Sequence, residues 1–264
     1  MHRAIIGFTG FVGTTLKRQT VFEFFYNSKN ISSIDGTSLE TIICAAAPAQ
    51  KWIANREPLA DRQNIHGLIE HLKTVTCNTF ILISTVDVFC NANKVNEDTL
   101  ITQEGLNPYG LHRRELEEFV EANFANYLIV RLPGIVGPGL RKNVIFDFLN
   151  TNNLHAIDSR GVFQFYPIIN LWYDIQIALK AELKLVHLTA EPISVLEVAE
   201  TCFGKDFDQV LSTTPATYDF QSKYAALFGG KGMYQYSKRE TIQAIRAYAQ
   251  TEPITIENTS GGNL

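Results

Sequence analysis

Short apolar runs alternate with longer segments of helical period through the first half of the chain. Each run has the length and continuous hydrophobicity of a strand that is buried on both faces. Between the runs, residues 61–74 and 107–124 repeat their apolar positions with the period of a helix, so that Leu116, Phe119 and Val120 share one face. The predicted strands are residues 4–8, 21–26, 42–47, 79–84, 127–132 and 185–188. Strands that alternate with helices indicate βαβ units and a parallel sheet.

The pattern becomes less regular after about residue 138. A short helix is predicted over residues 143–149, an aromatic-rich segment follows at 163–173, and two capping boxes begin at Ser194 and Ser237. We therefore predict a sheet domain over residues 1–138 and a smaller mixed lobe, mainly over 139–264, from which one strand and one helix return to the sheet. Residues 259–264 are expected to fray.

Composition and charge narrow the class of protein. Hydrophobic residues make up 45% of the chain and charged residues 19%, which predicts a folded core rather than disorder. A net charge of −4 gives no basic footprint for nucleic acid. The four cysteines are isolated from one another and from histidines, which disfavours a disulfide framework and a metal site. Neither a signal peptide nor a membrane span is recognisable, so we expect a cytoplasmic protein.

The first predicted strand ends in a glycine-rich turn, G-F-T-G-F-V-G. Glycines at this spacing allow a tight turn, a close approach of backbone N–H groups to a pyrophosphate, and close packing of the following helix on the strand. A plain turn from strand to helix is the alternative. The position in the first βαβ unit favours a dinucleotide site. Its expected residues are Gly7, Thr9, Gly10, Phe11, Val12 and Gly13.

The end of the second predicted strand bears on the choice between NADP and NAD. An NAD site usually has Asp or Glu there, to hold the ribose 2′-hydroxyl. This chain has Asn27, Ser28 and Lys29 instead. Amide, hydroxyl and ammonium groups suit a 2′-phosphate, which a carboxylate would repel. NADP is therefore the expected cofactor and NAD the alternative, unless Lys29 is only a solvated loop charge.

Three further segments, together with the glycine turn, resemble the extended short-chain dehydrogenases/reductases, which include nucleotide-sugar epimerases, dehydratases and reductases. The segments are I-C-A-A-A-P (43–48), I-S-T-V-D-V-F (83–89), and P-Y-G-L-H-R followed by R-L-P-G-I-V-G-P-G (108–113 and 131–139). The resemblance implies a Rossmann-type doubly wound parallel sheet with a C-terminal substrate lobe. It implies that Ala45, Ala46 and Ala47 pass under the cofactor, that Leu132 and Pro133 touch the nicotinamide, and that helices near the tyrosine form a homodimer.

The resemblance also implies catalytic roles for Thr85 and Tyr109, but it has two departures. The segment between the glycine helix and Cys44 is short, and Arg113 stands where the family has a lysine. Asn107 and Pro108 predict a helix start that places Tyr109 in the first turn, with Arg113 on the same face. A nearby cation favours the phenolate of a tyrosine, so Arg113 is expected to supply the charge while differing from lysine in shape.

The flanking residues His112 and Arg114 are expected to lie at the surface. Thr85 is expected to bond the same sugar oxygen as Tyr109, or else to be a strand threonine satisfied by backbone.

The sequence T-V-D lacks the glutamate of the family's dehydratases, which leaves reduction of a keto sugar slightly ahead of epimerisation. The expected substrate is a small sugar, nucleotide-linked, with contacts from Asn143, Asp87 and Tyr166. The alternatives are a charged helix start at residues 141–143, a strand-end contact for Asp87 and a core position for Tyr166. A protein of another class, a sensor that binds NADP(H) without turnover, remains a second hypothesis because of Arg113.

Overall fold

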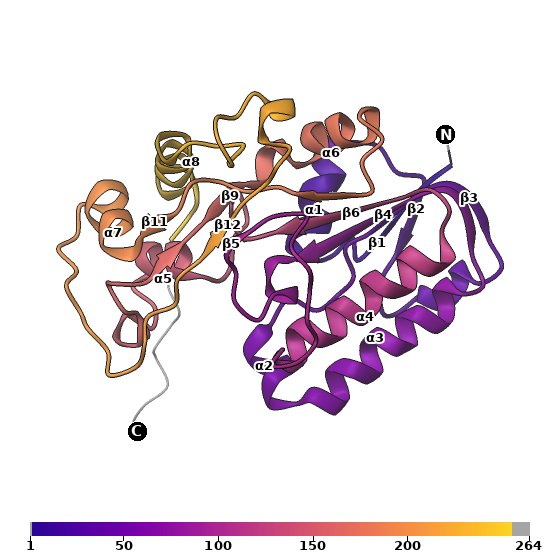
Figure 1. The fold of residues 1–264 in the computed structure, drawn as a ribbon, viewed down its shortest axis with the longest axis horizontal. Helices are drawn as coiled ribbons and strands as arrows, with labels where there is room; N and C mark the ends of the chain where they lie inside the picture. Colours follow the sequence, from indigo (N-terminus) through magenta and orange to yellow (C-terminus); the bar gives the residue numbers. More distant parts are fainter. Residues whose placement is uncertain (1, 255–264) are drawn as a thin grey trace, which may run out of the picture.

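The computed structural model describes residues 2–254, in which a parallel sheet of six strands carries helices on both faces (Figure 1). The strand order is β10-β6-β4-β3-β1-β2. This is the predicted doubly wound sheet, with boundaries that differ by a few residues. The strands are β1 (Arg3–Ile6), β2 (Phe24–Tyr26), β3 (Ser38–Cys44), β4 (Thr76–Thr85), β6 (Tyr127–Leu132) and β10 (Leu185–His187).

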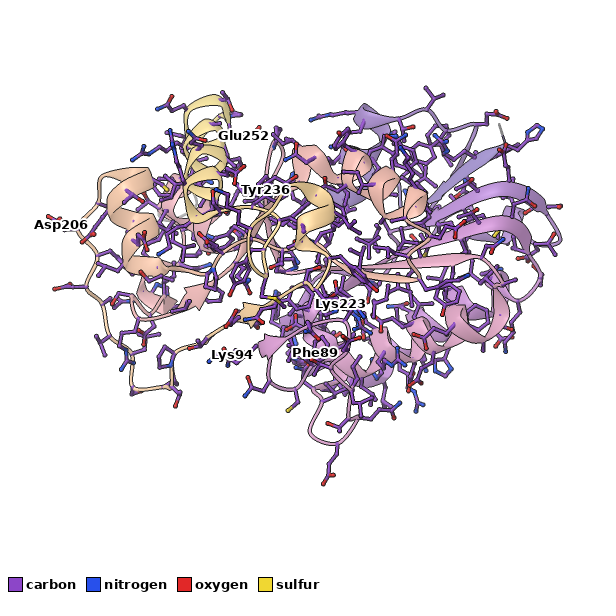
Figure 2. All side chains as sticks on the ribbon, turned by 45° about the horizontal axis from the view of Figure 1, so that its top comes forward. Phe89, Lys94, Asp206, Lys223, Tyr236 and Glu252 are labelled. Carbon is purple, nitrogen blue, oxygen red and sulfur yellow. The ribbon has the colours of Figure 1, made fainter. Side chains whose placement is uncertain are left out.

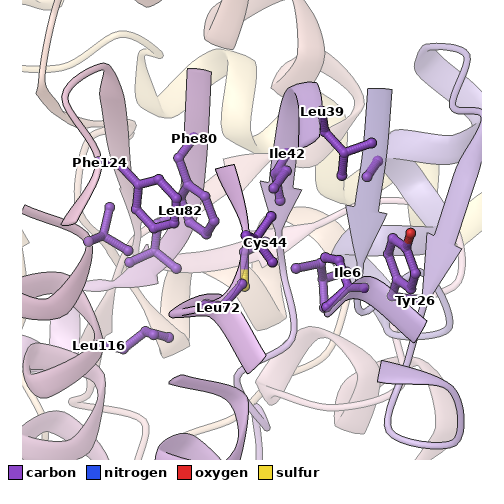
Figure 3. Close-up of a cluster of buried hydrophobic side chains, with 14 of the residues drawn as sticks. Ile6, Tyr26, Leu39, Ile42, Cys44, Leu72, Phe80, Leu82, Leu116 and Phe124 are labelled. Atoms are coloured by element: carbon purple, nitrogen blue, oxygen red, sulfur yellow. The ribbon is translucent and has the colours of Figure 1, made fainter. Parts of the chain in front are cut away.

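Two pairs of helices cover the sheet, one pair on each face (Figure 1). On one face lie α3 (Pro58–Leu72) and α4 (Pro108–Asn123), whose Ile65, Leu72, Leu116 and Val120 pack on Ile42, Phe80 and Leu82 of the strands (Figure 3). On the other face lie α1 (Phe11–Gln19) and α6 (Leu171–Lys180), with Leu16, Leu171 and Ile175 in a second core. Burial on both faces explains why the strands read as unbroken apolar runs.

The expected shortening after the glycine helix is present. The usual order of this fold places two strands beyond β1 on one side. Here only β2 lies there, with three residues, and the chain passes through one 3-10 turn, η1 (Ile31–Ile34), directly into β3. The order in which successive strands are added to the sheet still reverses at β1, because β2 lies on one side of β1 and β3 on the other. Such a switch point leaves a crevice at the carboxyl ends of the strands, where ligands bind in folds of this type.

The smaller lobe is built on short strand pairs and three helices. β7 (Gly134–Val136) pairs with β9 (Phe165–Pro167), and β8 (Val162–Phe163) pairs with β11 (Ile193–Ser194). Around them pack α5 (Val144–Asn150), α7 (Val195–Phe203) and α8 (Lys238–Thr251). Ser237 and Glu240 form a complete capping box, and the Ser194 hydroxyl accepts a hydrogen bond from the Glu197 backbone.

The chain crosses between sheet and lobe several times. β5 (Asn93–Val95) follows β4 but pairs with β12 (Asp219–Phe220), while α6 and β10 return from the later half to the sheet. Phe89 and Lys223 lie in this region, and the Phe89 ring contacts that of Phe220 (Figure 2). α2 (Lys51–Arg56) and the 3-10 turns η2 (Val86–Val88), η3 (Leu154–Ala156), η4 (Ile168–Asn170) and η5 (Ala225–Phe228) complete the fold.

No helix within residues 2–254 has both the length and the hydrophobicity to span a bilayer. The expectation for residues 259–264 falls outside the described part of the chain.

Candidate active site

The glycine turn has the geometry that its sequence predicts. Gly7 has φ +86°, and a Cβ there would lie 2.4 Å from the Ala45 carbonyl oxygen. A Cβ on Gly13 would lie 2.2 Å from the Gly7 carbonyl oxygen, so glycine is required for the close packing of α1 on this turn. Gly10 is the N-cap residue, and the first backbone N–H groups of α1 have no partner inside the helix. They make the switch point of the sheet a favourable place for a phosphate.

Two lysines lie near the end of β2: Lys29, which was predicted from the sequence, and Lys17, which was not. Asn27 accepts a hydrogen bond from the Lys29 backbone at 2.9 Å, which leaves the Lys29 side chain exposed in a tight turn. The Nζ atom of Lys17, on α1, lies 5.0 Å from the Phe8 ring centroid and 5.6 Å from that of Phe25. Lys17 thus stands between the glycine turn and β2. The sequence around Lys17 did not indicate a place in the cofactor site, because only the fold brings α1 and the end of β2 together.

Thr85 and Tyr109 meet at the carboxyl end of β4. Thr85 is the last residue of β4 and the register partner of Leu132, the last residue of β6. Its hydroxyl accepts from the Asp87 backbone at 3.2 Å and also bonds the Tyr109 phenol. A Cβ on Gly110 would lie 2.0 Å from the Asp87 carbonyl oxygen, so this glycine lets the first turn of α4 approach the end of β4.

The start of α4 is fixed as the sequence predicts. The Asn107 side chain caps the helix by accepting from the Gly110 backbone at 3.0 Å, and Pro108 occupies the first helical position. The Tyr109 backbone N–H donates to Asn55 of α2 at 3.0 Å. Both contacts hold the tyrosine in the first turn, with its side chain almost completely buried.

Burial raises the pKa of the Tyr109 phenol above the usual tyrosine value. The positive charges of Arg113 and Lys51 and the hydrogen bond with Thr85 act in the opposite direction, while the Asp87 carboxylate adds to the effect of burial. The phenol therefore keeps its proton at neutral pH. A tyrosine in this state is a proton donor.

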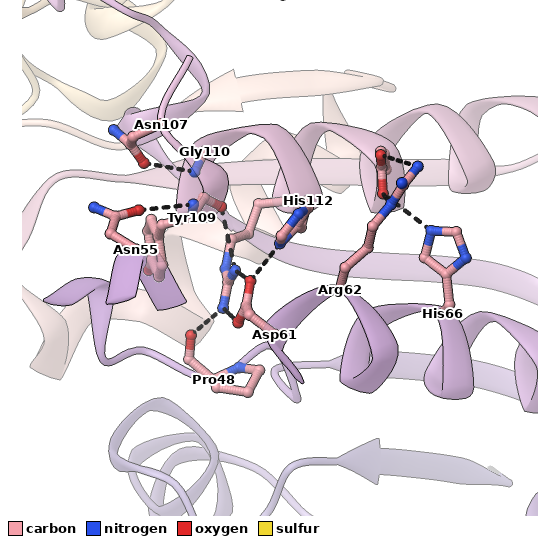
Figure 4. A network of polar contacts seen from close by, with 11 residues as sticks. Pro48, Asn55, Asp61, Arg62, His66, Asn107, Tyr109, Gly110 and His112 are labelled. Atoms are coloured by element: carbon pink, nitrogen blue, oxygen red, sulfur yellow. Dashed lines mark hydrogen bonds and ion pairs between the residues drawn. The ribbon is translucent and has the colours of Figure 1, made fainter. Parts of the chain in front are cut away.

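The side chain of Arg113 is held by contacts within the protein, and its partners Pro48, Asp61 and Tyr109 are shown in Figure 4. It forms a bidentate pair with Asp61 of α3, at 2.9 Å for one of the two contacts, and it donates to the carbonyl oxygens of Pro48 and Tyr109. Its guanidinium lies 3.9 Å from the centroid of the Tyr109 ring. Of the N–H groups of Arg113, the buried Nε–H alone has no hydrogen-bond partner among the described residues. Arg113 therefore brings a positive charge to the phenol, as expected, but its terminal N–H groups are already used.

Two expectations about the neighbours of Arg113 were wrong. His112 is buried, with Nδ1 2.7 Å from Asp61 Oδ2. Arg114 is mostly covered and pairs with Glu117, Glu118 and Glu121. Although burial opposes ionisation of Asp61, hydrogen bonds from Arg113 and His112 lower the pKa of this carboxyl below its usual value. α3 covers the face of α4 that carries His112 and Arg113, whereas Arg114 lies against glutamates of its own helix.

Two lysines lie at the edge of the site, and one of them, Lys51, was not predicted from the sequence. Lys51 Nζ lies 2.6 Å from Asp87 Oδ1, and the Tyr218 hydroxyl lies 3.3 Å from the same oxygen. Lys142 donates to the Ala49 carbonyl, in the loop that follows Ala45–Ala47. Loss of hydration and the nearby charge of Arg113 lower the pKa of Lys142.

The remaining expected residues separate into two groups. The backbone N–H of Ala45 donates to the Ile6 carbonyl at 2.8 Å, so the loop of Ala45, Ala46 and Ala47 runs beside the glycine turn. Leu132 ends β6 as the register partner of Thr85, and Pro133 follows it. Asn143 is instead the N-cap of α5, its side chain accepting from the Ile145 backbone at 3.0 Å. Tyr166 is completely buried and donates to Asp174 at 2.5 Å, so its expected contact with substrate was wrong and the core alternative holds.

The fold is the Rossmann-type doubly wound parallel sheet with a C-terminal lobe that the resemblance implied. No protein-family model matches the sequence, and a search of curated proteins gives no significant match.

Solved structures match over almost the whole chain. A dTDP-4-dehydrorhamnose reductase from Clostridium acetobutylicum is 16% identical, with a TM-score of 0.73 over 95% of this chain and 99% of its own. A dTDP-4-dehydrorhamnose reductase from Bacillus anthracis, in complex with NADP, is 17% identical, with a TM-score of 0.70 over 94% of this chain and 97% of its own. A UDP-glucuronic acid 4-epimerase from Bacillus cereus, in complex with NAD, is 16% identical, with a TM-score of 0.66 over 95% and 98%. At these identities the likeness is one of fold.

Proposed function

We propose that this protein is an NADP(H)-dependent reductase of a keto sugar, carried on a nucleotide, with Tyr109 as the proton donor. The observation that carries the proposal is the pairing of Tyr109 with Thr85 at the carboxyl end of β4, which is the same end of the parallel sheet as the glycine turn that follows β1. The pair lies at the edge of the sheet where the switch point opens. The similar solved structures include reductases and epimerases of sugar nucleotides, one of them in complex with NADP.

The glycine turn fits a dinucleotide. The missing side chains at Gly7 and Gly13 keep the backbone open, and the N-terminus of α1 offers N–H groups to a pyrophosphate. Lys29, Ser28 and Asn27 at the end of β2 include no carboxylate, and Lys17 adds a second cation beside this turn. NADP is therefore preferred to NAD. The nicotinamide would lie near Ala45–Ala47 and Pro133, where it supplies hydride to the sugar carbon.

Three residues would then assist the reduction of the sugar carbonyl: Tyr109, Thr85 and Arg113. The buried phenol of Tyr109, which is protonated at neutral pH, donates its proton to the carbonyl oxygen as the carbonyl is reduced. Thr85 bonds the phenol and orients it toward that oxygen. The charge of Arg113, 3.9 Å from the ring centroid, stabilises the phenolate left behind. Since Asp61, Pro48 and the Tyr109 carbonyl occupy its terminal N–H groups, Arg113 is not the donor that holds the nicotinamide ribose.

The protonated phenol also bears on the direction of reaction. Reduction begins with proton donation, whereas epimerisation through a ketone begins with proton removal from a sugar hydroxyl. A phenol that holds its proton at neutral pH is in the state that the first reaction needs, and it must lose that proton before the second can begin. Epimerisation is the second candidate, favoured by the likeness to UDP-sugar epimerases. A sensor without turnover would have no need of both Thr85 and Tyr109.

The test is NADPH oxidation with a panel of 4-keto sugar nucleotides. Tyr109→Phe removes the proton donor and is expected to lower kcat about 10²–10⁴-fold, the usual contribution of a general acid. Tyr127→Phe makes the same chemical change at the start of β6, outside the site, and is expected to leave kcat unchanged. Equal rates for wild type and Tyr109→Phe would contradict the catalytic assignment. Tight NADPH binding without turnover on any sugar would favour the sensor.

A further inference from the structure

Three polar side chains from three distant segments converge beside the candidate active site. Lys51 is the first residue of α2, Asp87 lies two residues beyond Thr85, and Tyr218 precedes β12 in the later half of the chain. Lys51 Nζ lies 2.6 Å from Asp87 Oδ1 and 3.5 Å from the Tyr218 hydroxyl, which is itself 3.3 Å from Asp87 Oδ1. We call Lys51, Asp87 and Tyr218 the polar triad.

The polar triad lines a hollow of about 160 Å³ that is open to solvent. Asn107, which caps the helix of Tyr109, and Cys90 line it as well. The hollow lies next to the candidate catalytic pair: the Asp87 backbone N–H donates to the Thr85 hydroxyl at 3.2 Å, and Asn107 caps the helix two residues before Tyr109. A ligand in the hollow would therefore lie beside the candidate active site.

The contribution of the polar triad to folding stability does not explain why these three residues are brought together. The Lys51 side chain is 39% exposed and that of Asp87 is 17% exposed, and ion pairs that keep such contact with water contribute little to folding. By contrast, the buried ion pair of Arg113 with Asp61 connects α4 to α3 and has a clear structural role. The polar triad is therefore better explained by a ligand than by the fold.

The hydrogen-bonding groups of the triad match hydroxyls. Lys51 offers donors, Tyr218 can donate or accept, and Asp87 uses only Oδ1 in contacts with the described residues, which leaves Oδ2 to accept. The lysine and the aspartate cancel in charge. A carboxylate placed in the hollow would gain Lys51 but would face Asp87 at the same time.

We infer that the polar triad is a recognition subsite for adjacent hydroxyls of an uncharged sugar ring, and that it discriminates against a ring bearing a carboxylate. The inference rests on the proposed function, since it names the class of sugar that the same site accepts. It assigns Lys51 and Tyr218 to specificity rather than to proton transfer.

The test measures binding of UDP-glucose and UDP-glucuronic acid to the protein saturated with NADP⁺, by calorimetry. Wild type is expected to bind UDP-glucose about tenfold more tightly, or better. Lys51→Met and Tyr218→Phe each remove a hydrogen-bonding group and are expected to weaken UDP-glucose binding, about tenfold for the charged donor. Asp87→Asn leaves Lys51 unpaired, so it is expected to shift the preference toward UDP-glucuronic acid about tenfold.

Lys73 and Glu70 provide the matched control. They form an exposed pair of the same length, 2.6 Å, at the end of α3. Lys73→Met and Glu70→Gln repeat the two charge changes outside the site and are expected to leave both affinities unchanged.

The outcomes separate the subsite from the proposed function. If both nucleotide sugars bind and no triad variant changes their ratio, the subsite is overturned while the proposed function stands. If the ratio shifts as expected but no keto sugar oxidises NADPH, the reductase assignment fails and the subsite stands. Failure of wild type to bind either nucleotide sugar would overturn both.

Discussion

At the scale of single residues, Arg113 stands where the family that the sequence resembles has a lysine, and the two side chains differ in the contacts that they can make. A lysine ammonium is a compact charge with rotatable donors, whereas a guanidinium forms fixed pairs with carboxylates. Arg113 has formed such a pair with Asp61, and it acts on the Tyr109 phenol through its charge and its stacking. If the proposed function is correct, Arg113 keeps the electrostatic part of the lysine's role, and another group would be the donor to the cofactor ribose.

We predict that two cations at the edge of the sheet determine a preference for NADPH over NADH. Lys29 follows β2 and Lys17 lies over the Phe25 ring, so both are placed to meet a 2′-phosphate. Lys29→Ala and Lys17→Ala are each expected to lower the ratio of kcat/KM for NADPH to that for NADH about tenfold, through KM. The rate with NADH should not change, because NADH has no 2′-phosphate.

Steady-state kinetics with both cofactors checks this prediction, with Lys73→Ala as the control at the far end of α3. An unchanged ratio in both variants would mean that Lys17 and Lys29 are ordinary surface charges. A loss with NADPH and NADH alike would point to damage to the glycine turn.

At the scale of elements, two buried networks fix helix α4 and therefore the position of Tyr109. Glu117 is completely buried and accepts hydrogen bonds from Ser84 of β4 at 2.5 Å and from Arg131 of β6 at 2.7 and 2.9 Å. On the other side, Asp61 of α3 accepts from His112 and Arg113 (Figure 4). The helix is thus tied to the sheet and to its neighbouring helix by charged groups that have no access to water.

Removing the charge of Asp61 is expected to destabilise the protein strongly. Asp61→Asn leaves Arg113 buried without a counter-charge, and the loss of one partner of a buried pair costs about 3–5 kcal/mol. Because the folded-state pKa of Asp61 is lowered, its stabilisation is complete above the unfolded pKa, near ~3.9, and is lost as pH falls through the folded value. The difference between wild type and variant should therefore shrink in acid.

Urea unfolding at a series of pH values from neutral to acid measures this difference. Glu70→Gln, at an exposed position of the same helix, is the control and should change the free energy of unfolding by less than ~0.5 kcal/mol. A loss for Asp61→Asn that stays constant down to acid pH would show that shape, not charge, is what Asp61 contributes.

At the scale of the whole molecule, sheet and lobe are interlaced rather than joined by a linker. β5 leaves the first half to pair with β12, and β10 returns from the second half to pair with β6. Glu97, just after β5, accepts from the His187 backbone at 2.8 Å, the Ser222 hydroxyl at 2.7 Å and the Lys223 backbone at 2.9 Å. The candidate site lies where these crossings meet, since Tyr218 and Lys142 reach it from the lobe.

Local signals in the sequence were sufficient for the sheet, the glycine turn and the start of α4. Continuous apolar runs mark strands buried on both faces, and Asn107 and Pro108 mark a helix start by their own chemistry. What lies opposite a helix face is not a local property. His112 is buried because Asp61, 51 residues away, packs against it, and Lys51 meets Tyr218 across 167 residues. Tyr166 was misplaced for the same reason, because an aromatic residue reads alike in a core and in a site.

An interlaced chain should unfold as one unit, and Glu97 is the residue that tests this. Glu97→Gln keeps the size of the side chain but removes the charge that three donors share, so we expect a loss of about 1.5–3 kcal/mol in the free energy of unfolding. The two tryptophans, Trp52 of α2 and Trp172 of α6, report on the sheet. Phe207→Trp in a background without them reports on the lobe, where Phe207 packs edge-on against Phe148.

Urea unfolding followed by both fluorescence probes should give one midpoint in the parent proteins, and Glu97→Gln should lower both midpoints equally. A shift confined to the lobe probe would mean that the lobe melts separately, and that Tyr218 and Lys142 leave the site before the sheet unfolds.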